Sequence, residues 1–192
     1  MIKLSHDFCI EPFGDPIGTN VEDVYPSLLQ KYNNPKYLKE REILTPKNEL
    51  VHELNEIIMK MIPGEGRTYY SSDNVCKASV NTKKEDILYP TDFLNNLRFL
   101  EISNHYIQLK VGIPVMLLRN LNQTDVPRLI FSSNETKCPF KLQRRQLSLA
   151  TCYAMTINKS QRQTLNQVGL YLPKHVFANG QLYVAVSRVR TR

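Results

Sequence analysis

Short apolar runs alternate with amphipathic stretches along this chain, and that alternation limits the fold more than any other feature of the sequence. Residues 42–44 form a strand-like run that leads into apolar side chains at helical spacing. Residues 146–157 and 168–172 are again strand-like, and residues 178–189 return to helical spacing. Strands that alternate with helices favour an α/β fold built around a layered sheet.

The first of these helices is the clearest local prediction. Its apolar side chains recur every three to four residues, and Pro63-Gly64 ends the pattern. The apolar stripe consists of Leu50, Val51, Leu54, Ile57, Ile58 and Met61. We therefore expect a helix that packs one face against the sheet.

Size and composition fit one globular domain with a small appendage. The chain has 192 residues, of which 42% are hydrophobic and 22% are charged. It contains no apolar run near the ~18 residues of a membrane-spanning helix, and Asp7 and Glu11 interrupt the apolar core that a signal peptide needs. The four cysteines form no CxxC pair, which argues against a zinc site. We expect an intracellular protein with reduced cysteines, no bound metal and no membrane partner.

Positive charge is concentrated in the last third of the chain. Residues 128–192 contain eleven Lys or Arg and one acid, Glu135, for a net charge of +10. The whole chain carries +7, so residues 1–127 carry the difference of −3. A basic segment joined to a mildly acidic one indicates contact with a polyanion such as nucleic acid. The alternative is that these residues simply solvate an exposed face.

Three segments carry a resemblance to a known family. Residues 154–161, Ala-Met-Thr-Ile-Asn-Lys-Ser-Gln, resemble the fifth helicase motif of PIF-type (petite integration frequency) DNA helicases of superfamily one, including those of Helitron transposons. Residues 180–189 resemble the sixth motif, and residues 109–120 resemble the signature around the small barrel inserted in that family's second motor domain. Residues 43–65 are similar to the start of that domain. The resemblance covers nearly the whole chain in the right order.

The resemblance implies a RecA-like (P-loop NTPase-type) second motor domain with a remnant of the inserted small β-barrel. Residues 1–106 would form the first part of the RecA-like domain, residues 107–139 the barrel remnant, and residues 140–192 the remainder with the fifth and sixth motifs. In such motors two RecA-like domains hold ATP between them and move single-stranded DNA as the cleft opens and closes. We therefore expect the fifth and sixth motifs to lie close together.

The resemblance also assigns roles to individual residues. Arg188 would be the catalytic arginine finger that stabilises charge on the γ-phosphate, with Gln161 and Ser187 beside it on the nucleotide side. Phosphates of the DNA backbone would bind Thr156, Asn158, Lys159 and Ser160. Arg144 and Arg145 would extend this basic surface. Each assignment has a plainer alternative. Arg188 could be a cation placed favourably near the end of a helix, and the fifth motif could be an ordinary polar turn. Arg144 and Arg145 could be solvated surface residues.

Two motifs of a complete motor are absent from this sequence. None of the seven glycines is followed by Lys, and no Asp-Glu pair occurs, so the Walker A and Walker B motifs have no candidates. ATP and Mg²⁺ are therefore expected as cofactors only if a separate first motor domain completes the site. For the isolated chain we expect no cofactor and no ATP hydrolysis.

Two departures from the family pattern lie within the matching part. Arg162 occupies the position at which the family has glycine after Lys-Ser-Gln. If that position requires a positive φ, Arg162 would add strain of about 1–3 kcal/mol. The stretch between Asn120 and Pro139 is also shorter than the family pattern, which indicates a truncated barrel.

The leading hypothesis is therefore the carboxy-terminal part of an ATP-dependent DNA helicase with five-prime to three-prime polarity. By family resemblance its setting would be nuclear, in DNA repair, recombination and telomere maintenance. Its partners would be single-stranded DNA and a separate first motor domain, and the chain would be a monomer. The alternatives are an inactive helicase or mobile-element remnant that at most binds single-stranded DNA, and an unrelated basic nucleic-acid adaptor.

Overall fold

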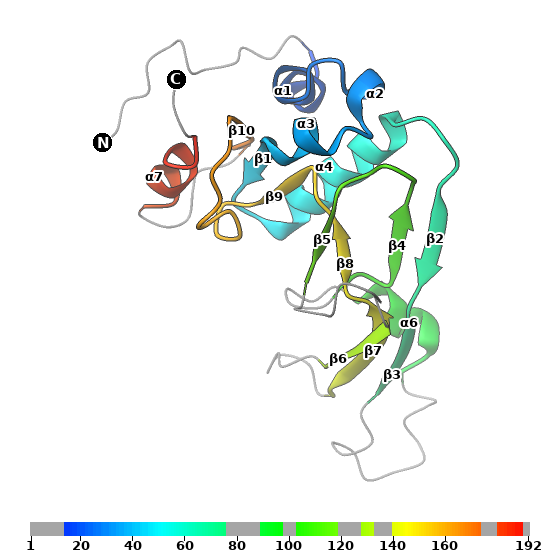
Figure 1. The fold of residues 1–192 in the computed structure, drawn as a ribbon. Helices are drawn as coiled ribbons and strands as arrows, with labels where there is room; N and C mark the ends of the chain where they lie inside the picture. Colours follow the sequence, from blue (N-terminus) through cyan, green and yellow to red (C-terminus); the bar gives the residue numbers. More distant parts are fainter. Residues whose placement is uncertain are drawn as a thin grey trace. The chain divides into compact units, whose positions relative to one another are not determined.

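The computed structural model describes residues 14–75, 89–97, 103–118, 128–132, 140–173 and 180–189. The chain forms two compact units (Figure 1). Unit 1 comprises Met1–Gly64, Val111–Pro114 and Thr151–Arg192, and unit 2 comprises Glu65–Lys110 and Val115–Ala150. These limits do not coincide with the boundaries expected at 106/107 and 139/140, because strands from residues 67–75 pair with strands from residues 106–147.

Unit 1 is built on a parallel three-stranded sheet. Its strand order is β10 (Gln167–Leu170), β1 (Arg41–Thr45) and β9 (Ala154–Thr156), so β1 is central. Ile43 lies opposite both Ala154 and Gly169. Residues 42–45 of β1 are all buried, as expected for a parallel strand covered on both faces.

Helices cover both faces of this sheet. They are α1 (Pro16–Val24), α2 (Leu28–Lys31), α3 (Pro35–Lys39), α4 (Asn48–Met61) and α7 (Gln181–Val186). Because side chains alternate along a strand, Ile43 joins a core cluster with α1 and α4, whereas Leu44 joins a second cluster with Ala185 of α7. This arrangement confirms the predicted α/β fold.

Helix α4 corresponds to the apolar stripe seen in the sequence. Leu54 and Ile58 are fully buried in the first core cluster, as predicted. Met61 is 40% exposed, whereas Asn55 and Met59 are buried. The buried face is therefore rotated slightly from the apolar stripe, because the amide of Asn55 faces the sheet.

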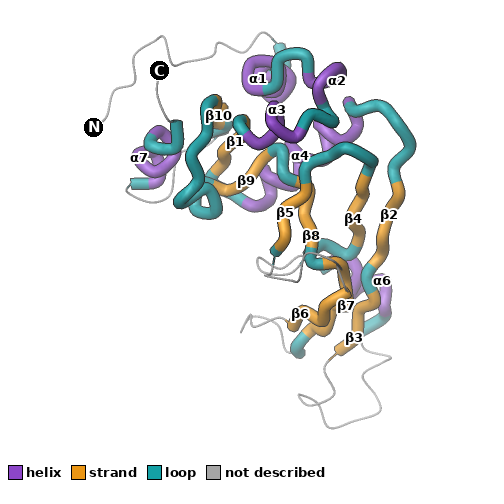
Figure 2. Tube along the Cα trace, in the orientation of Figure 1, coloured by secondary structure: helices purple, strands orange, loops and turns teal. Residues whose placement is uncertain are grey.

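Unit 2 consists mainly of strands (Figure 2), most of which pair in the antiparallel direction. One sheet pairs β2 with β4, a second has the order β3-β7-β6, and β5 pairs with β8. The elements are β2 (Arg67–Tyr70), β3 (Ser72–Val75), α6 (Thr91–Asn96), β4 (Tyr106–Leu109), β5 (Val115–Leu117), β6 (Arg128–Ser132), β7 (Leu142–Leu147) and β8 (Leu149–Thr151). Leu94 of α6 packs with Phe140 and Leu142 to form the core of this unit.

The described part of the chain contains no helix with the length and apolar character needed to cross a membrane. Within the same residues, no three His, Cys, Asp or Glu side chains gather as metal ligands.

Candidate functional site

The candidate site is the turn that follows β9 in unit 1. Thr156 ends β9 opposite Thr45, the last residue of β1, and the N–H of Ile157 donates to the Thr45 carbonyl at 3.0 Å. The turn therefore leaves the sheet at the carboxyl end of its parallel strands. Open α/β sheets bind their ligands at this end.

Hydrogen bonds within the turn fix its shape. The N–H groups of Lys159 and Ser160 donate to the Thr156 carbonyl at 2.9 and 3.2 Å. The Ser160 hydroxyl donates to the Ile157 carbonyl at 2.7 Å, and the Thr156 hydroxyl accepts from the Lys159 N–H at 3.4 Å. Both hydroxyls are thus used inside the turn.

The predicted DNA-binding residues of this turn differ in how far their side chains are exposed to solvent. Ser160 is fully buried, so the prediction that its hydroxyl contacts DNA is wrong in this structure, and the hydroxyl stabilises the turn instead. Thr156 is 8% exposed. Asn158, Lys159 and Gln161 are exposed on the outer side of the turn, where a ligand could reach them. The DNA contacts of Thr156, Asn158 and Lys159 and the nucleotide contact of Gln161 remain predictions.

Arg162 adopts a left-handed backbone conformation with φ of 71°. The position at which the family pattern has glycine therefore requires a positive φ, which glycine adopts without steric cost. A side chain with a Cβ atom costs about 1–2 kcal/mol there. Arg162 is exposed, so its guanidinium adds charge to the outer side of the turn.

The fifth and sixth motifs lie close together, as predicted. Met155 and Ile157 share a core cluster with Ala185 of α7. Just beyond the turn, the N–H of Leu165 donates to the Arg188 carbonyl at 2.9 Å, and Leu165 forms a parallel bridge with Val189. The two segments therefore pack against each other within unit 1.

Arg188 is half-buried at the junction of α7 and the turn. Its Nε donates to the Val184 carbonyl at 3.0 Å, and its Nη1 reaches the Gln163 carbonyl at 3.5 Å. Its Nη2 donates to the Ser187 hydroxyl at 2.8 Å. These contacts hold the guanidinium beside the turn, while Ser187 positions it. Arginine carries five N–H donors, so donors remain for an anionic ligand.

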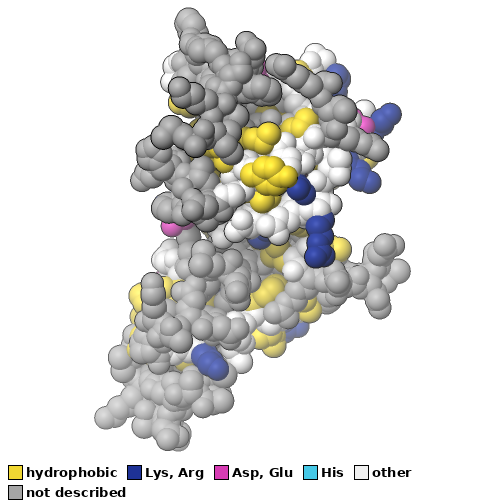
Figure 3. Space-filling view, turned by 90° about the vertical axis from the view of Figure 1, so that its left-hand side faces the viewer, with side chains coloured by type: hydrophobic (Ala, Val, Ile, Leu, Met, Phe, Trp, Pro, Cys, Tyr) yellow, Lys and Arg dark blue, Asp and Glu magenta, His cyan; other side chains and the backbone are white. Residues whose placement is uncertain are grey.

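The charged side chains that form this site are all cations. Lys159, Arg162 and Arg188 lie within it, and the sequence has no Asp or Glu after Glu135. Figure 3 views the side of the chain on which Figure 1 shows α7, and Lys and Arg side chains lie there beside hydrophobic ones. An anionic ligand is therefore favoured.

Asn55 of α4 holds β9 in place and was missed by the sequence analysis. Its side-chain oxygen accepts from the N–H groups of Tyr153 and Ala154 at 2.9 and 3.1 Å. Its Nδ2 donates to the carbonyls of Ala154 and Val51 at 3.0 and 2.9 Å. Asn55 thus positions the strand that leads into the turn. The sequence did contain a sign of this role, because Asn55 places a side-chain amide directly beside the apolar position 54 of a helix that packs on the sheet.

A buried carboxyl lies on the face of β1 that carries Leu44. Glu42 is 5% exposed, and its two oxygens lie 3.9 and 4.0 Å from the Cys152 sulfur. Burial raises the pKa of Glu42 well above its ordinary value of 4.5. Burial also raises the pKa of the thiol of Cys152, a free cysteine, which favours the protonated thiol over the thiolate.

Arg144 of β7 is fully buried in unit 2, so the prediction that it contacts DNA is wrong. Its Nε and Nη2 donate to the carboxylate of Asp73 at 2.7 to 3.0 Å. Its remaining bonds reach the carbonyls of Leu94, Leu97 and Ser103 at 3.1 to 3.2 Å. The guanidinium thus caps the carboxyl end of α6 and ties it to β3. Arg145 is exposed on the other face of β7, and its DNA contact remains a prediction.

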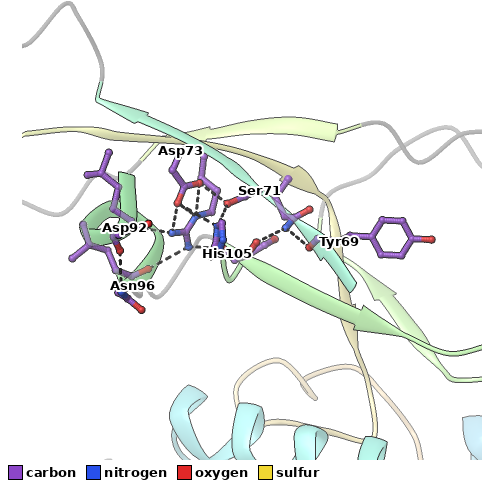
Figure 4. A network of polar contacts seen from close by, with 11 residues as sticks. Tyr69, Ser71, Asp73, Asp92, Asn96 and His105 are labelled. Atoms are coloured by element: carbon purple, nitrogen blue, oxygen red, sulfur yellow. Dashed lines mark hydrogen bonds and ion pairs between the residues drawn. The ribbon is translucent and has the colours of Figure 1, made fainter. Parts of the chain in front are cut away.

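Ser71 and His105 extend this buried ion pair (Figure 4). The Ser71 hydroxyl donates to Asp73 at 2.5 Å and lies 2.8 Å from Nδ1 of His105. The single hydrogen of the serine hydroxyl is directed at Asp73, and the role of Nδ1 in the second contact depends on the tautomer of His105.

Comparison with known proteins shows similarity to Pif1-type DNA helicases. ATP-dependent DNA helicase PIF1 from Xenopus laevis is 29% identical over 210 residues, which are 91% of this chain and 30% of that protein. Human PIF1 is 33% identical over 116 residues, which are 44% of this chain and 18% of that protein. Residues 92–125 match the family described as DNA helicase Pif1, 2B domain. The chain is therefore similar in sequence to Pif1-type DNA helicases.

Solved Pif1 structures share its fold. Pif1 helicase from Candida albicans matches 91% of this chain and 47% of its own with a TM-score of 0.57 and 18% identity. Bacteroides Pif1 helicase in complex with ADP-AlF3 and ssDNA matches 93% of this chain and 48% of its own with a TM-score of 0.51 and 18% identity. These matches show that the chain shares the α/β fold of those structures. The chain spans about a third of the length of the curated proteins that it matches.

Proposed function

We propose that this chain forms the second motor domain of an ATP-dependent, five-prime to three-prime Pif1-type DNA helicase. Unit 1 is its RecA-like body, and unit 2 corresponds to the inserted small β-barrel, which overlaps the matched residues 92–125. The observation that carries the proposal is a basic turn beside Arg188 at the carboxyl end of the parallel sheet, with Lys159 and Arg162 exposed on it.

In this proposal the two sides of the site have separate tasks. Asn158 and Lys159 bind phosphates of single-stranded DNA, because an amide and an ammonium donate hydrogen bonds without reading the base sequence. Arg188 stabilises the charge that develops in phosphoryl transfer, and Gln161 and Ser187 lie beside the nucleotide. ATP and Mg²⁺ bind when a first motor domain supplies the Walker motifs. The chain acts as a monomer in the nucleus, in DNA repair, recombination or telomere maintenance.

Salt-dependent DNA binding tests the first task. Fluorescence anisotropy of a labelled oligothymidylate measures affinity at several salt concentrations. We expect affinity to fall as salt rises, and Lys159→Gln to reduce the salt slope by about 0.7, the contribution of one single-strand phosphate. An affinity that is independent of salt would reject phosphate binding.

Lys60→Gln is the matched control for Lys159→Gln. Lys60 is also an exposed lysine of unit 1, but it lies in the last turn of α4. That helix begins near the carboxyl end of β1, and Lys60 lies roughly 18 Å along the helix axis from its first residue. Lys60→Gln should therefore leave both the affinity and the salt slope nearly unchanged.

ATP turnover tests the second task. The chain is mixed with a separately expressed first motor domain of a Pif1-type helicase, and DNA-stimulated ATP hydrolysis is measured. Loss of an arginine finger lowers kcat by about 10³-fold or more, so Arg188→Ala should abolish measurable stimulation. Turnover that survives Arg188→Ala unchanged would remove this assignment.

The positive φ of Arg162 favours a second candidate, a helicase or mobile-element remnant that binds single-stranded DNA without supporting catalysis. A glycine at this position would let a phosphate approach the backbone, whereas the arginine side chain obstructs it. In the same mixture, stimulation by Arg162→Gly but not by the parent chain would favour this candidate.

A further inference from the structure

One face of unit 2 is exposed without interruption from β2 into β3. Thr68, Tyr70, Ser72 and Asn74 are all exposed, whereas the residues between them are partly or fully buried. Side chains of a strand alternate between its two faces. The regular alternation across Ser71 therefore indicates that β2 and β3 present one common outer face.

Hydrogen bonds join the two sheets along this face. The Ser71 N–H donates to the His105 carbonyl at 2.7 Å, which continues the pairing of β2 with β4. Gln146 of β7 is fully buried, and its Nε2 donates to the carbonyls of Tyr69 and His105 at 3.1 and 2.9 Å. The backbone beneath the outer face is therefore held by the same buried layer as the Asp73–Arg144 ion pair.

Two tyrosines stand side by side on this face. Tyr70 of β2 lies directly opposite Tyr106 of β4, and their exposed fractions are 59% and 39%. The ring of Tyr70 is supported by the ring of His105, with centroids 5.5 Å apart. Because Ser71 holds His105, the buried network fixes the orientation of the support under Tyr70.

Cations follow the tyrosines along the same face. Exposed Arg145 of β7 lies opposite Ser72 and Ile130, and exposed Arg128 begins β6. Asp73 is the one acidic residue within strands β2, β3, β4, β6 and β7, and it points inward to Arg144. The outer face of these strands therefore combines aromatic rings and guanidinium groups without a carboxylate.

We propose that this outer face is a base-stacking surface for single-stranded DNA, separate in its residues from the turn at residues 158–162. Exposed bases stack on the rings of Tyr70 and Tyr106, and Arg145 and Arg128 contact phosphates. Aromatic rings interleaved with cations bind single strands in this way without sequence preference. Opposite residues of an antiparallel pair have Cβ atoms about 5 Å apart, so the two rings suit neighbouring bases. Charge and polarity favour DNA over an apolar protein partner.

This inference rests on the proposed DNA binding and is tested with the whole chain. Anisotropy with an oligothymidylate of about 16 nucleotides compares the parent with Tyr70→Leu/Tyr106→Leu. Each ring removed should weaken binding about fivefold or more. The salt slope should not change, because no phosphate contact is lost. Tyr70→Phe/Tyr106→Phe keeps both rings and should bind nearly as the parent does.

Two further variants separate stacking from other effects. Phe93→Leu is the matched aromatic control, since Phe93 is 47% exposed but lies on α6, the helix that packs against the inner face of β3. It should leave affinity unchanged. Arg145→Gln should instead lower the salt slope by about 0.7. Ultraviolet crosslinking of an oligonucleotide that contains 5-iodo-deoxyuridine should attach it to Tyr70 or Tyr106.

The outcomes distinguish this surface from the turn in unit 1. If Lys159→Gln weakens binding while Tyr70→Leu/Tyr106→Leu binds as the parent does, the stacking surface is refuted and the proposed function stands. If the tyrosine variant loses affinity while Lys159→Gln does not, the surface stands and the turn assignment fails. A parent chain that binds no oligonucleotide refutes both DNA-binding proposals. Binding of an apolar peptide by that chain would then identify the face as a protein interface.

Discussion

Replacing Arg162 with glycine should stabilise this protein. Arg162 has a φ of 71°, in the left-handed region where a Cβ atom crowds the following carbonyl. That conformation costs a residue other than glycine about 1–2 kcal/mol. Glycine removes this cost but loses about 0.5–1 kcal/mol through the greater freedom of the unfolded chain. The net expectation is a gain of about 0.5–1 kcal/mol in the free energy of unfolding.

Urea and thermal unfolding followed by circular dichroism would measure this gain. For a chain of 192 residues, a gain of this size corresponds to a rise in Tm of about 1–4 °C. Arg162→Ala is the informative control, because it removes the same charge but keeps the Cβ atom. Arg162→Gly should therefore be more stable than Arg162→Ala.

Ser27→Gly provides an independent comparison within unit 1. Ser27 has a φ of 62° and is exposed, so the same backbone effect should appear there without any change in charge. If Arg162→Gly proves no more stable than Arg162→Ala, backbone strain is not what distinguishes this position. The effect of Arg162 would then come from its charge beside Lys159.

Three other substitutions test the interior. Because burial raises the pKa of Glu42 above 4.5, the folded state binds more protons, and its stability should fall as pH rises above that value. This fall in the free energy of unfolding is at most about 1.4 kcal/mol per pH unit, and Glu42→Gln should remove it. Urea unfolding at a series of pH values measures the difference. Asn55→Leu leaves two backbone N–H groups at β9 without their acceptor and should lower the free energy of unfolding by about 2–4 kcal/mol in the same assay. An unchanged free energy of unfolding would show that Asn55 does not hold β9 in place. Arg144→Met leaves Asp73 buried without its cation and should lower the free energy of unfolding by about 3–5 kcal/mol. Arg145→Met, the control at the exposed neighbouring position, should change it by less than about 0.5 kcal/mol.

The features that could be predicted from the sequence are those set by short stretches of chain. The helix at 48–61 follows from apolar spacing, and its Leu54 and Ile58 are buried as that spacing requires. The strand–turn–helix order places the fifth and sixth motifs in one unit. The unusual conformation at Arg162 could also be suspected, because a glycine position in a turn often needs a positive φ.

Arg144 and Arg145 illustrate what only the tertiary structure decided. In the sequence they are adjacent and equivalent, yet one is fully buried and the other is exposed. Their difference arises because β7 pairs with β3 in a register that places Asp73 opposite Arg144. A shift of one residue would reverse the two faces, and no local pattern specifies a partner that lies 71 residues away.

The division into two units and the burial of Ser160 were also decided only in the folded chain, for two different physical reasons. Strands from residues 67–75 join unit 2 because they pair with strands far along the chain, which overrides the boundary expected at residue 106. Ser160 has the chemistry of a phosphate ligand, but the turn folds its hydroxyl onto the Ile157 carbonyl. Residue type thus determined what each side chain can bind. Long-range pairing and local turn geometry determined which side chains face a ligand, because a hydrogen bond made inside the fold is unavailable outside it.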